Sequence, residues 1–189
     1  MKGIIFDVAA EVVREDYGEA TWDQLLDAAG SDGVYTALGS YSDAELLALV
    51  HAAAQELGTS DEEAMVLVGR RGFPILAGRY PSLMTGIDDV TGCLSALNTI
   101  IHPEVLKLYP GATPPSFEVA TDGDDLPLRY LSQRQMCRLA EGLALGSADW
   151  FDEPVSVTHD SCREAGDDSC VLRLRWAKEV VAPRAPVSR

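Results

Sequence analysis

The sequence predicts an α+β protein, in which an N-terminal helical part precedes a small antiparallel four-stranded sheet packed with a long helix. Two observations predict this class. Apolar residues recur at helical spacing through the first half of the chain. After about residue 110, proline-containing turns separate short segments of alternating apolar and polar residues, and one helical pattern lies between them.

The composition excludes several classes of protein. The chain has 189 residues, enough for one domain with a real core, and 47% of them are apolar. Its net charge of −15 argues against a nucleic-acid partner, which requires a basic surface. No window reaches the ~18 apolar residues of a spanning helix, and no secretory signal is evident. We therefore expect a cytoplasmic protein without a membrane partner, whose cysteines stay reduced.

The N-terminal part is expected to be helical. Residues 3–17 and 21–29 each place apolar side chains on one side of a helix, and residues 30–41 are rich in glycine, serine and aspartate, which predicts a loop. Two helices with capping signals should follow. Their capping boxes are formed by Ser42 with Glu45 and by Ser60 with Glu63. A glycine and a proline within residues 72–74 are expected to kink or divide the second helix.

A further helical pattern ends in a histidine followed by a proline. Residues 87–101 carry the pattern, and His102 and Pro103 come directly after it. Proline disfavours α geometry in the residue before it, so His102 is expected at a kink or at the start of a new turn. Imidazole is the usual axial ligand of haem iron, but a half-buried structural histidine fits the isolated residue better.

The C-terminal part is expected to contain a sheet and one helix. Four strands are predicted, at residues 117–119, 126–130, 155–159 and 171–176, the first two joined by an acidic turn at 122–125. An amphipathic helix is predicted at 132–145, and a flexible tail at 179–189.

Three polar residues lie where the second strand meets this helix. Tyr130, Ser132 and Arg134 would share one face of a strand and can converge on one ligand across the strand–helix boundary. The guanidinium binds carboxylates and the hydroxyls add donors, which suits the two propionates of haem. Alternatively, Ser132 forms a capping box with Gln135 while Arg134 is solvated; for Ser132 both roles are compatible.

A second metal site is suggested by Cys137, His159, Cys162 and Cys170. Three thiolates and one imidazole form a closed tetrahedral set, which is typical of structural zinc. The spacing is not a double CxxC motif. Unrelated buried thiols are the alternative, and Cys93 already requires that explanation.

Together these motifs resemble the H-NOX family of haem nitric oxide/oxygen sensors, over nearly the whole chain. The matching positions are residues 1–4, 43–49, His102, 111–115, the triplet Tyr130, Ser132 and Arg134, and residues 141–143. The resemblance implies one H-NOX domain at 1–178, with a distal part at about 1–82 and a proximal part at about 83–178. It also implies haem b, with His102 as proximal iron ligand and the triplet on the propionates.

The resemblance further implies which residues surround the haem. Pro115 would press on the macrocycle and distort it, and the distal positions would be Ile5, Ala9, Gly72, Leu76 and Leu139. Family members that hold dioxygen carry a tyrosine at the position of Leu139. Because none of these distal residues is polar, we expect a sensor of nitric oxide, able to bind carbon monoxide, that rejects dioxygen.

The family also implies what the sensor does. Nitric oxide would weaken or break the His102–iron bond, and the altered surface would be read by a sensor histidine kinase or a cyclic-di-GMP enzyme. A zinc-containing, bacterial subset of the family carries zinc at positions matching the cysteine–histidine set. The rival hypothesis is a haem-free, zinc-stapled module of the 4-vinyl reductase type that binds a small molecule. No motif of an enzyme is present.

Overall fold

The computed structural model describes residues 1–177, and the predicted tail at 179–189 lies outside them. The predicted α+β architecture is confirmed. The helices are α1 (Gly3–Tyr17), α2 (Glu19–Ala29), α3 (Asp43–Leu57), α4 (Asp61–Arg79), α5 (Val90–Ala96), α6 (His102–Leu108) and α7 (Cys137–Trp150), with short turns η1 (Pro81–Met84), η2 (Leu97–Ile101) and η3 (Arg163–Ala165). The strands are β1 (Ser116–Val119), β2 (Asp125–Leu131), β3 (Val155–Ser161) and β4 (Cys170–Trp176).

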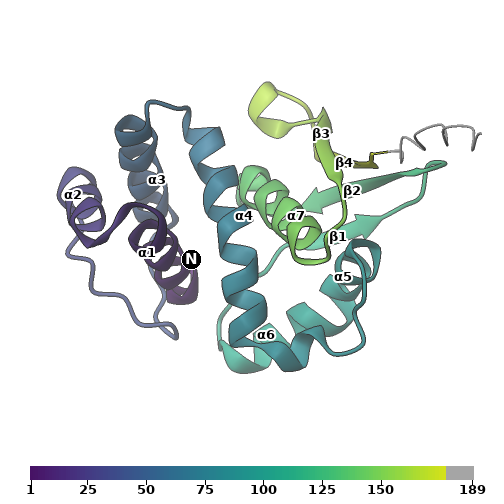
Figure 1. Ribbon diagram of the computed structural model, residues 1–189, viewed down its shortest axis with the longest axis horizontal. Helices are drawn as coiled ribbons and strands as arrows, with labels where there is room; N and C mark the ends of the chain where they lie inside the picture. The colour runs from purple at the N-terminus through teal and green to yellow at the C-terminus, as the bar shows by residue number, and fades with distance from the viewer. Residues whose placement is uncertain (178–189) are drawn as a thin grey trace, which may run out of the picture.

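The elements form two packed regions joined by one long helix. Figure 1 shows α4 in the middle of the molecule, with α1–α3 on one side and α7 and the sheet on the other. The sheet is antiparallel in the order β1-β2-β4-β3. Among the described residues, no helix is long and apolar enough to cross a membrane.

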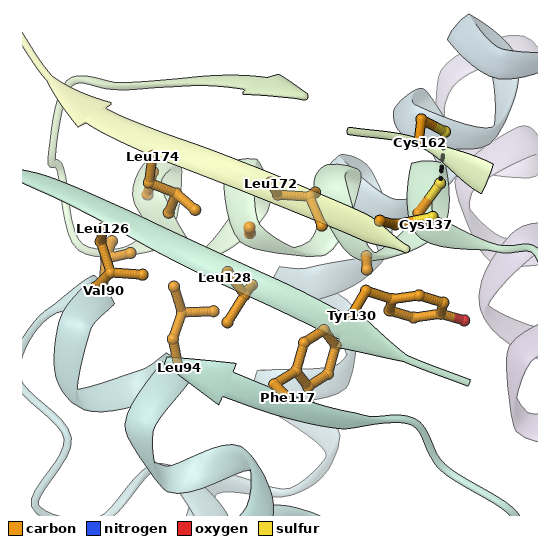
Figure 2. Close-up of a cluster of buried hydrophobic side chains, with 14 residues drawn as sticks. Val90, Leu94, Phe117, Leu126, Leu128, Tyr130, Cys137, Cys162, Leu172 and Leu174 are labelled. Carbon is orange, nitrogen blue, oxygen red and sulfur yellow. Dashed lines mark hydrogen bonds between the residues drawn. The ribbon is translucent and has the colours of Figure 1, made fainter. Parts of the chain in front are cut away.

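Each region has its own hydrophobic core. One core lies between α1, α2 and α3 and includes Phe6 and Trp22. The other lies between the sheet, α5 and α7, where Figure 2 shows Leu128 and Leu172 side by side from neighbouring strands. Burying apolar surface on one face of the sheet explains the alternation of apolar and polar residues in β2.

One of the two predicted capping boxes is wrong. At the start of α4, Ser60 and Glu63 form the reciprocal pair as predicted. At the start of α3, the Ser42 hydroxyl accepts from the Ala44 amide at 3.1 Å and no reciprocal bond forms. The Glu45 carboxylate instead accepts from the hydroxyls of Ser31 and Tyr35, at 2.9 and 2.7 Å. The glutamate therefore fixes the preceding loop instead of closing the cap.

Helix α4 runs through its proline without being divided, contrary to one of the two predicted outcomes. Pro74 lacks the amide that would bond to the Arg70 carbonyl. That carbonyl lies beside Gly146 of α7, so the site of the missing bond is covered by the neighbouring helix. The Arg70 side chain adds a bidentate ion pair with Asp149 at 2.6 and 2.8 Å.

Glycines allow α4 and α7 to pack with their backbones in close approach. A Cβ atom on Gly142 would overlap the Val66 carbonyl oxygen, and one on Gly69 would lie 2.6 Å from the Leu139 carbonyl oxygen. Side chains larger than hydrogen do not fit at these two positions, so the close packing of the helices depends on the glycines.

The path into His102 is helical throughout. Helix α5 continues into the π-helical turn η2, and His102 follows with α-helical dihedral angles, φ −67° and ψ −37°, as the first residue of α6. Pro103 lies in the first turn of α6, where a missing backbone N–H costs little. The histidine therefore begins a new helix that directly continues the previous one.

Helix α7 begins five residues later than the predicted bound at 132. Ser132 does not form the alternative capping box with Gln135. Its hydroxyl accepts from the Arg134 amide at 3.0 Å, which holds the chain in a turn between β2 and α7. Residues 132–136 therefore form this hydrogen-bonded turn instead of the first turns of the helix.

Candidate functional site

A largely apolar cavity of about 390 Å³ lies between the two packed regions. Its walls come from the start of α1, the second half of α4, the continuous path from α5 to α6, the segment 111–115, strands β1 and β2, and α7. A cavity at the junction of several elements, with few polar groups, is the usual form of a cofactor site.

The predicted iron ligand lies on the wall of this cavity. The Nδ1 atom of His102 is buried and makes no hydrogen bond. Burial lowers the pKa of His102, and a backbone interaction with Pro115 opposes the shift. The ring lies 6.0 Å from that of Phe117, centroid to centroid. A neutral imidazole with an unsatisfied nitrogen beside a cavity is a histidine ready to bind metal.

The three predicted propionate ligands also converge on the cavity. Tyr130, Ser132 and Arg134 all line it. In Figure 2 the Tyr130 ring leaves β2 with its hydroxyl directed away from the buried leucines. Burial raises the pKa of Tyr130, although a hydrogen bond with Ser132 opposes this, so the phenol stays protonated and can donate.

The guanidinium of Arg134 is positioned by Asp43 and Thr113, to which the sequence analysis gave no role in the site. Its Nε donates to Asp43 at 2.7 Å, and its Nη1 donates to the carbonyl and the hydroxyl of Thr113, at 2.8 and 2.5 Å. Although burial acts in the opposite direction, hydrogen bonds from the N-terminal amine and Arg134 lower the pKa of Asp43. The arginine is therefore held by an ionised partner from α3 and is not simply solvated.

The predicted distal residues are only partly at the cavity. Ile5, Leu76 and Leu139 line it, as does Pro115. Ala9 and Gly72 are buried but are not part of the lining. Gly72 lies against Val8 of α1, where a Cβ atom would come within 2.6 Å of that side chain.

Two tyrosines at the cavity were missed by the sequence reasoning. The hydroxyls of Tyr80, after α4, and Tyr109, after α6, are hydrogen-bonded to each other. Burial raises the pKa of Tyr109, and its contact with Tyr80 adds to the shift. The pair joins the end of the histidine helix to the end of α4. The 29 residues between them hide the contact from any local pattern.

The three predicted zinc-binding cysteines lie together. The sulfur atoms of Cys137, Cys162 and Cys170 are all within 4.8 Å of one another, and the Cys137 and Cys162 sulfurs are 3.6 Å apart (Figure 2). Burial and the neighbouring thiols raise the pKa of Cys137, whereas backbone hydrogen bonds lower that of Cys162 despite its burial. This is a compact set of soft donors of the kind that zinc prefers.

The fourth predicted zinc ligand lies beside this cluster. The Nε2 atom of His159 is 2.8 Å from Glu141 Oε2, while its Nδ1 is buried without a hydrogen-bond partner. The hydrogen bond with Glu141 raises the pKa of His159, and a weaker interaction with the Cys162 thiol acts in the same direction. An orphaned imidazole nitrogen beside the Cys162 thiol fits a fourth metal ligand, although neither nitrogen of His159 lies within 4.8 Å of all three sulfurs.

Comparison with known proteins places these sites in context. A family model described as haem-NO-binding matches residues 2–159. An H-NOX protein from S. oneidensis, solved in its Fe(II)NO ligation state, is 33% identical with a TM-score of 0.86, over 94% of this chain and 100% of that one. The H-NOX domain from Shewanella oneidensis in the Fe(II)CO state is 32% identical, with a TM-score of 0.84, over 95% and 100%.

A more distant structure shows the same fold. The Fe(II) unliganded H-NOX protein from K. algicida is 26% identical with a TM-score of 0.80, over 96% of this chain and 100% of that one. No curated protein matches the chain.

Proposed function

The chain belongs to the haem-NO-binding, or H-NOX, family, whose model covers most of its length, and from that premise we propose that it is a haem-based sensor of nitric oxide. H-NOX domains bind haem and sense gases such as nitric oxide and carbon monoxide; they are sensor domains and not enzymes. One observation carries the proposal: His102 and the triplet Tyr130, Ser132 and Arg134 line the same apolar cavity.

The residues present fit a haem group. His102 offers the imidazole for iron, since its Nδ1 is buried without a partner. Tyr130, Ser132 and Arg134 offer donors for propionates, and Pro115 lies on the wall where it would contact the macrocycle. When bound, haem b would supply an iron atom that His102 could ligate and that could bind a gas.

The apolar lining supports selectivity against dioxygen. Ile5, Leu76 and Leu139 carry no donor that could stabilise the negative charge on bound dioxygen, whereas nitric oxide and carbon monoxide depend far less on one. The ferrous protein is expected to shift its absorption spectrum with nitric oxide and not with air. A stable dioxygen spectrum in air would contradict this selectivity.

The signal is proposed to leave through α6. His102 is the first residue of this helix, so a bond from His102 to a haem iron would hold the helix at its start, and the loss of that bond would free it there. The exposed apolar side chains of Ile100, Leu106 and Leu108 lie on η2 and α6 and would move with it. We propose that a sensor histidine kinase or a cyclic-di-GMP enzyme reads this surface in the cytoplasm.

The experiment that tests the proposal replaces the iron ligand. His102→Gly is expected to lose haem unless imidazole is supplied in the buffer, because the small molecule then takes the place of the missing ring. His51→Gly, at the surface of α3, is the matched control and should retain haem without imidazole. Full haem retention by His102→Gly in imidazole-free buffer would refute the ligand assignment.

A zinc ion is proposed at Cys137, His159, Cys162 and Cys170, supported by the clustered sulfurs and the unpaired His159 Nδ1. A closed set of four protein ligands is structural.

The alternative, a haem-free 4-vinyl reductase type of module with this zinc alone, is not favoured, because such a module has no need of the haem ligands on the cavity wall. Measuring iron and zinc on one sample of the purified protein distinguishes the two functions. About one iron and one zinc per chain support the haem sensor, whereas zinc without iron supports the alternative.

A further inference from the structure

Glu141 is a largely buried carboxylate beside the proposed zinc site, and neither proposed site has so far given it a role. It lies on α7 four residues after Cys137, so both side chains project from the same face of the helix. Its side chain is only 13% exposed, and that of His159 on β3 is 10% exposed. A buried carboxylate requires partners, so its contacts define its role.

Its first contact settles which nitrogen of His159 carries hydrogen. Glu141 Oε2 lies 2.8 Å from His159 Nε2. An ionised carboxylate can only accept, so Nε2 must donate. In the neutral imidazole the lone pair is then on Nδ1, the atom that is buried without a hydrogen-bond partner. A histidine paired with glutamate for stability alone would leave its other nitrogen in solvent or bonded.

Its second contact holds the carboxylate in place. Arg138 Nη1 donates to the same Oε2 atom at 2.9 Å, from one turn earlier in α7. Arg138 Nε lies 3.9 Å from Glu164, in the loop that separates Cys162 from Cys170. The carboxylate is thus fixed between the helix that provides one cysteine and the strand that provides the histidine.

We infer that Glu141 is a positioning residue for the metal, holding His159 in the tautomer and orientation that present Nδ1 to a zinc ion bound by Cys137, Cys162 and Cys170. Carboxylates behind metal-bound histidines do this by accepting from the second ring nitrogen. The inference rests on the proposed zinc site and adds a residue that does not touch the metal.

The test measures zinc affinity of the full-length protein by competition with a chromogenic chelator. Glu141→Ala is expected to weaken zinc binding about 10–100-fold. The zinc affinity of Glu141→Gln should fall between those of the wild type and Glu141→Ala, because the amide oxygen of the glutamine still accepts from Nε2 of His159. Asp149→Asn removes another ion-paired carboxylate of α7 and should leave the affinity unchanged. Haem content should be equal in all four proteins.

A second measurement separates positioning from general stability. In the metal-free wild type, ¹⁵N NMR should show His159 with its neutral form protonated at Nε2, and in Glu141→Ala a mixture of both tautomers. Equal zinc affinity in wild type and Glu141→Ala, or an unchanged tautomer, overturns the inference. If the wild type binds no zinc, the zinc proposal itself fails, and this inference fails with it; the wild-type titration distinguishes the two cases.

Discussion

Leu139 is the single residue on which the proposed gas selectivity depends most. It lines the cavity and also packs against the core between α3 and α4. Leu139→Tyr places a hydroxyl donor on the cavity wall, and the variant is expected to show a dioxygen spectrum in air when ferrous. Leu139→Phe, which adds the ring without the hydroxyl, is the control and should not. Identical spectra for the two variants in air would show that a donor here does not decide selectivity.

His102 should also control how the haem-free protein responds to acid. Because burial lowers its pKa in the folded state, the unfolded chain binds more protons below the ordinary value of 6.5. Stability is therefore fully present above pH 6.5 and is lost as the pH falls towards the folded pKa. In urea unfolding of the metal-free and haem-free protein between pH 7 and pH 5, His102→Leu should lose less stability than the wild type. An equal loss would mean that His102 is accessible to protons.

The sequence identified residues with distinctive chemistry better than the residues that hold them. His102, Tyr130 and Arg134 were singled out because imidazole, phenol and guanidinium in this spacing resemble a known haem site, and their binding of haem stays a prediction. Asp43, the partner of Arg134, lies 91 residues away, and no local pattern connects the two. Glu141 was part of a family motif, but its contact with His159 depends on how α7 packs against β3.

The contact between α4 and α7 is the element pair most sensitive to small changes. Gly142→Ala would place a methyl group against the α4 backbone and is expected to destabilise the protein by about 1–3 kcal/mol or more. Gly78→Ala, in the same α4 helix with open space around it, should be neutral or stabilise by up to about 1 kcal/mol. Chemical denaturation of the two variants checks this, and equal stabilities would show that the helices can separate without cost.

Element types were predictable from periodicity, and their boundaries only in part: α1 has the predicted bounds, whereas α7 begins five residues late. The alternation in β2 and the helical spacing of α1 predicted the correct element types, because the apolar residues that form these patterns are the residues buried in the structure. Helix α4 was expected to be kinked or divided at Pro74, but packing against α7 keeps it one helix. The predicted start of α7 failed because the Ser132 hydroxyl bonds locally to the Arg134 amide.

At the scale of the whole molecule, the two cores predict that zinc supports the region of the sheet, whereas haem in the cavity between the two regions would contact both. The cysteine cluster joins α7, β4 and the loop after β3 and belongs to the core of the sheet. Removing zinc with a chelator is expected to lower the melting temperature by several degrees, since a ligand at about 100–1,000 times its Kd stabilises by ~3–4 kcal/mol. Cys93→Ala leaves the cluster intact, so its zinc content should equal that of the wild type. An unchanged melting temperature after verified zinc loss would exclude a structural role.

The general layout followed from the sequence, and the cavity between its two regions did not. The division of one domain into a distal part at about 1–82 and a proximal part at about 83–178 stays a prediction. The cavity wall combines residues from Met1 to Ser147, so it exists only once both regions have packed on α4. Such a site is a property of the assembled chain and of no single motif.

The π-helical turn before His102 carries a consequence for insertions and deletions. Helix α5 is anchored by Val90 and Leu94 in the core of the sheet, and η2 holds one residue more per turn than an α-helix would. Five residues that each turn the chain by about 80° rotate it about as far as four α-helical residues at about 100° each. Deleting one residue from Leu97–Ile101 would therefore let the segment relax to regular α-helix and leave His102 close to its present direction. The same deletion within the regular α-helical turns of α5 has no such compensation and would rotate His102 by about 100°, away from the cavity, on an intact helix. The π-helical turn is thus the place on the path to His102 where the loss of one codon is best tolerated.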